Sequence, residues 1–74
     1  MFKYIIINTK TGKAVQTWSY ADKKHIIYCT DPYWAMKFDK ESDCIRTITK
    51  LLKDFPNQSL SSMKIKIKTI IEFG

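Results

Sequence analysis

Glycine, arginine and histidine are nearly absent from this 74-residue sequence. The two glycines are Gly12 and Gly74, so no glycine-rich loop could cradle a phosphate group. Arg46 is the single arginine, and arginine is the residue best suited to bidentate recognition of guanine, so its scarcity argues against sequence-specific reading of DNA. His25 is the single histidine and has no predictable carboxylate partner, so the sequence gives it no catalytic role.

Cysteine is equally scarce. Cys29 and Cys44 are too far apart for a CxxC motif, and no histidine cluster accompanies them, so the sequence indicates neither a zinc site nor a redox motif. Both lie in apolar periodic stretches, which predicts buried free thiols rather than nucleophiles with a base within reach. We therefore expect a protein that is not an enzyme and that uses no cofactor and no metal.

Long hydrophobic runs are also missing. The isoleucine run Ile5 to Ile7 is too short for a signal sequence or a membrane span, which predicts a cytosolic protein. The length allows one small domain, residues 1–74. The net charge of +6 favours nucleic acid or an acidic surface as partner. However, twelve lysines and eleven isoleucines are also what an AT-rich genome encodes, and the two explanations stay open.

The hydrophobic pattern predicts an α+β fold in the order β-β-β-α-β. It is a small antiparallel sheet of about four strands, with one main helix packed on one face. Gly12 supplies the positive φ of a tight hairpin turn, and Asp31-Pro32 begins a short helical turn that places Tyr33, Trp34 and Phe38 against the core. The main helix has Asp39 as its N-cap and ends before Pro56. The strands are expected at residues 2–8, 13–19, 25–30 and 63–73.

A single helix covers one face of such a sheet. Its apolar stripe comprises Cys44, Ile45, Ile48, Leu51, Leu52 and Phe55. The uncovered face is expected to carry four isoleucines that a homodimer or another protein would bury: Ile5, Ile7, Ile27 and Ile70. In the alternative, the turn with Tyr33 and Trp34 folds over that face.

Charged residues cluster at two places. Lys64, Lys66 and Lys68 share one side of the last strand at a spacing of about 6.5 to 7 Å. They either contact nucleic acid phosphates or protect a sheet edge from aggregation. Asp39, Glu41 and Asp43 stand at the start of the helix, where negative charge is favourable, and they could also form an acidic partner-binding patch.

The hairpin with Thr11-Gly12-Lys13, the helix entry with Ala35 and Lys37-Phe38-Asp39, and the final Lys/Ile strand resemble small early, host-takeover proteins of Gram-positive phages. These include inhibitors of the bacterial sliding clamp, the beta subunit of DNA polymerase III. The resemblance implies a bacteriophage protein that inhibits host DNA replication by binding the clamp and blocking DNA loading or passage through its channel.

The residues themselves bear on this expectation in two ways. Gln58 and Leu60 are loosely similar to the peptide that clamp ligands insert into a pocket, although the adjoining apolar pair is missing. A clamp channel is expected to be basic, so a +6 chain would contact it through its acidic triplet or block it as a dimer. The alternative function is a small basic nucleic-acid-binding module acting through the lysine strand. A third possibility is a small hydrolase that uses Cys29 or His25.

Overall fold

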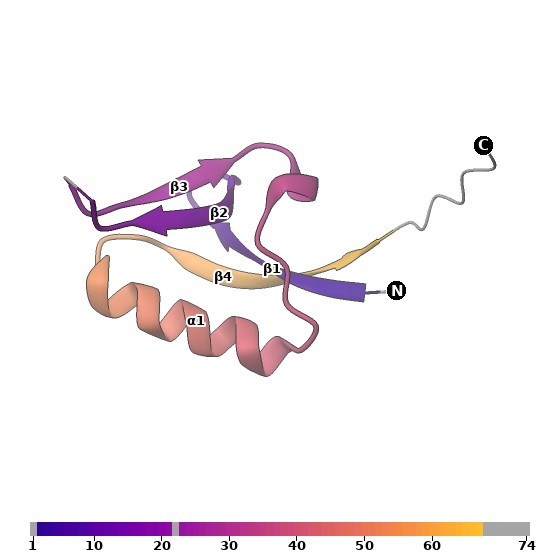
Figure 1. The fold of residues 1–74 in the computed structure, drawn as a ribbon. Coiled ribbons are helices and arrows are strands. Elements are labelled where there is room, and N and C mark those ends of the chain that lie inside the picture. Colours follow the sequence, from indigo (N-terminus) through magenta and orange to yellow (C-terminus); the bar gives the residue numbers. More distant parts are fainter. Residues whose placement is uncertain (1, 22, 68–74) are drawn as a thin grey trace.

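The computed structural model describes residues 2–21 and 23–67 and confirms the α+β class and the β-β-β-α-β order. Four antiparallel strands form one sheet, with a single α-helix beneath it and a short 3₁₀ turn on the opposite side (Figure 1). The elements are β1 (Phe2–Asn8), β2 (Ala14–Ser19), β3 (His25–Cys29), η1 (Pro32–Trp34), α1 (Glu41–Asp54) and β4 (Leu60–Lys66). Among the described residues, no helix has the length and apolar character that crossing a bilayer requires.

The sheet has the strand order β3-β2-β1-β4, so β3 and β4 are its edges. The turn between β1 and β2 has Gly12 at φ 75°, as the sequence predicts. Its backbone is closed by Gly12 N–H donating to the Asn8 carbonyl over 2.8 Å. Beyond this turn β1 and β2 diverge, and Ile7 opposite Ala14 is their one ladder pair. In contrast, β1 pairs with β4 over its whole length, from Phe2–Lys66 to Asn8–Leu60.

The connection from η1 to α1 passes through the gap between the diverging strands. Met36 N–H donates to the Val15 carbonyl of β2, and Phe38 exchanges two backbone hydrogen bonds of 2.9 Å with Tyr4 of β1. Ala35, just before this point, packs on one side of the sheet, whereas Phe38 packs on the helix side. The segment therefore supplies the sheet hydrogen bonds that β1 and β2 do not make to each other.

Each side of the sheet has its own apolar cluster. The helix side buries Ile6, Val15, Cys44, Ile48 and Leu51. The opposite side buries Ile5, Ala14 and Ala35, with Ile7, Cys29 and Ile65 packed around them. Ile5 has no exposed surface, so the expectation that it lies on an open face is wrong. It is covered because the small Ala35 side chain lets the crossing segment approach the sheet closely.

Two boundaries differ from the predicted ones. β4 begins at Leu60 rather than at residue 63, because β1 provides pairing partners for the polar residues Ser61 and Ser62. The predicted strand residues 68–73, including Ile70, lie outside the described part of the chain. The N-cap of α1 is Lys40, without a side-chain cap, instead of Asp39. The Asp39 carboxylate is ion-paired with Lys3 of β1, which removes it from the helix end.

Candidate functional site

The most exposed aromatic side chains of the described chain lie on η1. Tyr33 is 61% and Trp34 69% exposed, so the expectation that they pack against the core is wrong. Phe38 does pack against the helix-side core, as expected. Ala35 takes the buried position on the η1 side, which leaves the two large rings in solvent. Aromatic residues in such positions are enriched among the residues that dominate protein interfaces.

The backbone of η1 is held by several local hydrogen bonds. Asp31 caps the turn, since its Oδ1 accepts the Tyr33 N–H over 2.9 Å and its carbonyl accepts the Trp34 N–H over 3.0 Å. Lys37 Nζ donates to the carbonyls of Tyr33 and Ala35. Pro32 at the first position fixes one more backbone angle. The turn therefore presents its two rings from a constrained backbone, which lowers the ordering cost of binding.

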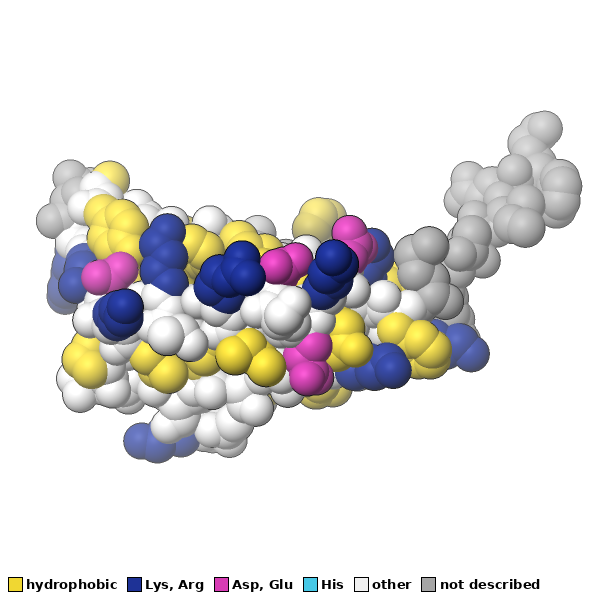
Figure 2. Space-filling view, turned by 90° about the horizontal axis from the view of Figure 1, so that it is seen from below, with side chains coloured by type: hydrophobic (Ala, Val, Ile, Leu, Met, Phe, Trp, Pro, Cys, Tyr) yellow, Lys and Arg dark blue, Asp and Glu magenta, His cyan; other side chains and the backbone are white. Residues whose placement is uncertain are grey.

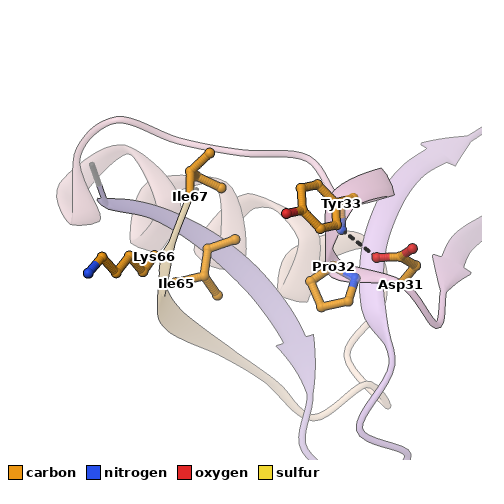
Figure 3. A pocket seen from close by; sticks show the side chains of 6 residues that line it. All are labelled: Asp31, Pro32, Tyr33, Ile65, Lys66 and Ile67. Atoms are coloured by element: carbon orange, nitrogen blue, oxygen red, sulfur yellow. Dashed lines mark hydrogen bonds between the residues drawn. The ribbon is translucent and has the colours of Figure 1, made fainter. Parts of the chain in front are cut away.

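A shallow pocket of about 250 Å³ separates η1 from the end of β4. It is lined by Asp31, Pro32, Tyr33, Ile65, Lys66 and Ile67. Figure 3 shows Ile65 and Ile67 on the side of β4 that faces η1, whereas the amine of Lys66 points away. The pocket is therefore mainly apolar inside, with the Asp31 carboxylate at its margin.

Two further hydrophobic side chains are exposed on this side of the sheet. Ile27 of β3 is 37% and Met63 of β4 45% exposed. Met63 lies opposite Ile5 in the ladder, which places it on the η1 side. Of the four isoleucines predicted on the open face, Ile27 is thus partly exposed, and Ile7 is half-buried against the η1-side cluster. We define the docking surface as Tyr33, Trp34, Ile27, Met63 and the pocket.

The lysines of β4 lie on the other side of the sheet. Lys64 is opposite Tyr4 and Lys66 opposite Phe2 in the ladder, and both lysines are exposed. Lys64 Nζ is 4.5 Å from the centre of the Phe2 ring, within the range of a cation–π contact. Lys68 lies outside the described residues. Cations are spread along the helix side of the molecule, with fewer acidic groups between them (Figure 2).

The acidic triplet is partly neutralised by neighbouring cations. Asp39 pairs with Lys3, whose hydrogen bond and positive charge lower the pKa of this carboxyl. Asp43 lies 3.8 Å from Arg46 one turn along α1. Glu41 shares the first turn of α1 with Asp43. The three carboxylates are therefore a weak candidate for an acidic contact patch.

Gln58 and Leu60 have contacts within the fold. Gln58 Oε1 accepts from the Tyr28 hydroxyl over 2.7 Å and from Asn8 Nδ2 over 3.2 Å. Asn8 is buried, and its Nδ2 also lies 3.1 Å from the Tyr28 oxygen. Leu60 packs against the helix-side core. These contacts argue against the predicted partner-binding role of Gln58 and Leu60, and sequence patterns gave no signal for the polar triad Asn8–Tyr28–Gln58.

The two thiols lie on opposite sides of the sheet, and the histidine is exposed. Burial raises the pKa of Cys44, with the charge of Glu41 adding to it, and Cys44 Sγ lies 3.5 Å from the Ile5 carbonyl. Burial and then Asp31 raise the pKa of Cys29, against a smaller opposing effect of Lys37. His25 Nδ1 lies 2.5 Å from the Lys23 carbonyl in an exposed turn. Within residues 2–21 and 23–67, no three metal-binding side chains gather at one place.

Comparison of the chain with protein-family models, with curated proteins and with solved structures finds no match. The features that bear on function are therefore the docking surface and the charges around it.

Proposed function

We propose that this chain is a non-enzymatic binding protein that attaches to another macromolecule through its docking surface. The resemblance to phage early proteins suggests the bacterial sliding clamp as the partner, with binding in the bacterial cytosol. Occupation of the clamp would block the loading or passage of DNA and so inhibit host replication. The observation that carries the proposal is the exposure of Tyr33 and Trp34 on a turn whose backbone is fixed.

The exposure is informative because this small chain has few large side chains from which to build a core. Ten of its residues are aromatic, yet Tyr33 and Trp34, adjacent on η1, leave most of their surface in water. Contiguous exposed apolar surface of this kind often marks a protein-interaction site. The cap from Asp31 and the two bonds from Lys37 maintain that arrangement. A partner that covers both rings would gain their hydrophobic free energy without having to order the turn.

Charge also favours an aromatic contact over imitation of DNA. The chain carries +6, and Asp39 and Asp43 are each beside a cation. A basic channel would repel most of this surface. The docking surface, in contrast, is mainly apolar, with Asp31 at its margin. Among the possible contacts with the clamp, contact through Trp34 and Tyr33 is thus the one in which the positive charge of the chain causes the least electrostatic repulsion.

The proposal is tested by capturing the chain on purified clamp and by measuring clamp loading onto primed DNA. The wild-type chain should be retained and should inhibit loading. The double variant Tyr33→Ser with Trp34→Ser should do neither, although its fold is intact by circular dichroism. Ile45→Ala is the matched control, since Ile45 is also exposed but lies on α1. Absence of wild-type capture at micromolar concentrations, or equal capture of the double variant, would refute the proposal.

Homodimerisation, which the sequence also predicted, would use this same side of the sheet. Since Ile5 is buried within the chain, a dimer contact there has to involve Ile27 and the η1 rings. Light scattering over a range of concentrations tests this. A dimer mass for the wild type and a monomer mass for the Tyr33, Trp34 double variant would support a dimer through the docking surface, and a wild-type monomer at all concentrations would exclude it.

Nucleic acid binding is the second candidate function, favoured by the exposure of Lys64 and Lys66 on one side of an edge strand. It predicts affinity for a single-stranded oligonucleotide that falls steeply with salt, with a logarithmic slope of about −0.7 for each phosphate neutralised. Replacing Lys64, Lys66 and Lys68 by serine should abolish this binding. A flat dependence on salt would reject the candidate.

A further inference from the structure

Within residues 2–21 and 23–67, no strand pairs with the outer edge of β4. β4 is the last strand of the sheet, and it pairs with β1 on one side for all seven of its residues. In an antiparallel edge strand, every second residue has its backbone N–H and C=O groups pointing away from the neighbouring strand. The described part of the chain places no other strand against these groups. They are therefore ready to pair with a strand from another molecule.

The two sides of this edge differ in chemistry. On the helix side stand the amines of Lys64 and Lys66, both exposed. On the other side stand Met63 and Ile65, followed by Ile67 and the pocket between η1 and the end of β4 (Figure 3). A strand added here would alternate its side chains between the amines and the apolar surface. Opposite charges on neighbouring strands are favourable, so the positions beside the amines should be acidic.

The size of the pocket limits what enters it. Its volume of about 250 Å³ lies below the range of roughly 300 to 1,000 Å³ that is usual for clefts holding small-molecule ligands. Ile65 belongs to both β4 and the pocket wall, so the pocket lies next to the apolar side chains that a strand added to β4 would contact. The pocket thus suits one apolar side chain of an extended segment better than a free ligand.

A second copy of β4 fits this edge poorly. The segment from Leu60 to Lys66 contains two lysines and no acidic residue. If two copies of β4 paired, the lysines of both strands would lie in one sheet with no acidic residue of either strand to neutralise their charge. Lysine on an edge is a common obstacle to such self-association. An acidic strand removes this obstacle, so charge complementarity selects a different molecule.

We infer that β4 is extended by a segment of a partner protein in which acidic side chains alternate with apolar ones. Its acidic residues pair with Lys64 and Lys66, and one apolar residue enters the pocket between Ile65 and Tyr33. This inference deepens the proposed function, and it rests on that function only in assuming that the partner is a protein. Backbone hydrogen bonds to β4 hold the segment, and the alternation of its acidic and apolar side chains gives the binding its specificity.

The test uses a short synthetic peptide of alternating glutamate and valine, titrated into the full-length chain by calorimetry. The inference predicts saturable binding and increased hydrogen-exchange protection of amides in β4. The same peptide with alternate backbone nitrogens methylated should lose at least about tenfold in affinity, which corresponds to about 1.4 kcal/mol. A peptide with lysine in place of glutamate should not bind.

The matched variants are Lys64→Glu with Lys66→Glu, and Lys50→Glu with Lys53→Glu on the exposed face of α1. Both pairs change the net charge equally. The double variant in β4 should bind the lysine peptide in preference to the glutamate peptide. The double variant in α1 should still prefer the glutamate peptide. Equal loss in both pairs, or binding indifferent to methylation, would overturn the inference.

The two proposals fail separately. If no peptide binds but the Tyr33, Trp34 double variant still loses capture by the clamp, the edge-strand inference is wrong and the docking surface stands. If the peptide binds as described and the clamp does not capture the chain, the edge-strand inference stands and the clamp is not the partner.

Discussion

Asn8 should be the polar side chain on which the stability of this fold depends most. Its Oδ1 accepts the N–H groups of Lys10 at 2.9 Å and Thr11 at 3.2 Å, and its Nδ2 donates to Tyr28 and Gln58. A hydrogen bond contributes about 1 kcal/mol net, so four bonds set an upper limit of about 4 kcal/mol for Asn8→Ala.

Two effects lower this limit. The Tyr28 hydroxyl and Gln58 Oε1 remain paired at 2.7 Å without Asn8, and water can reach the exposed turn at Lys10 and Thr11. We therefore expect a loss of about 2 kcal/mol in the free energy of unfolding. For a domain of this size that is a fall of roughly 8 to 16 °C in Tm.

Urea denaturation followed by tryptophan fluorescence measures this loss, with Asn57→Ala at an exposed position as the control. Tyr28→Phe should cost about 1 kcal/mol. The double variant Asn8→Ala with Tyr28→Phe should cost less than the sum, because the two side chains share a hydrogen bond. A cost below about 0.5 kcal/mol for Asn8→Ala, typical of surface substitutions, would refute the assignment of Asn8 as a structural centre.

Three further predictions follow from local geometry. Gly12→Ala should cost about 1 kcal/mol and Gly12→Asn less, because a Cβ there meets no atom within 4 Å and the cost lies in the positive φ alone; equal losses in urea denaturation would contradict this. Cys44 should react with a thiol reagent only after unfolding, and Cys29 more slowly than free cysteine, because burial raises both pKa values; rapid labelling of native Cys44 would contradict it. The hydrogen bond that Tyr20 donates to Asp54 over 2.6 Å raises the pKa of Tyr20. The folded state thus holds this proton more tightly than the unfolded state, and the resulting stability is present below pH of about 10 and lost as pH rises through the folded pKa. In an ultraviolet titration, Tyr20→Phe should remove a component that ionises late, and a titration whose end is unchanged by this substitution would contradict the prediction.

The strands and the helix could be predicted because their signals are local. The β-branched and aromatic residues of β1 to β3 and the turn glycine at position 12 placed three strands to within one residue. The start of β4 was missed because Ser61 and Ser62 have little strand propensity of their own. Their strand conformation comes from pairing with Ile7 and Ile6, which is a tertiary effect.

The site was harder to predict because it depends on where the chain crosses the sheet. Backbone hydrogen bonds to Val15 and Tyr4 hold residues 35–38 between β1 and β2. Such bonds do not depend on the side chains, so the sequence pattern does not predict them. That crossing buries Ala35 and exposes Trp34, the reverse of what ring size suggests. The acidic triplet and Gln58 were chosen by charge and motif alone, and their ion pairs and hydrogen bonds depend on distant residues such as Lys3 and Tyr28.

The most direct test of the central claim is a calorimetric titration of purified sliding clamp with the wild-type chain and with Trp34→Ala. Trp34 is largely exposed, so its removal should change the stability of the chain by no more than about 0.5 kcal/mol. As a central interface residue it should cost at least about 2 kcal/mol of binding free energy, or roughly 30-fold in Kd. Wild-type and variant chains that bind with the same Kd would contradict the account, as would a wild-type chain that does not bind.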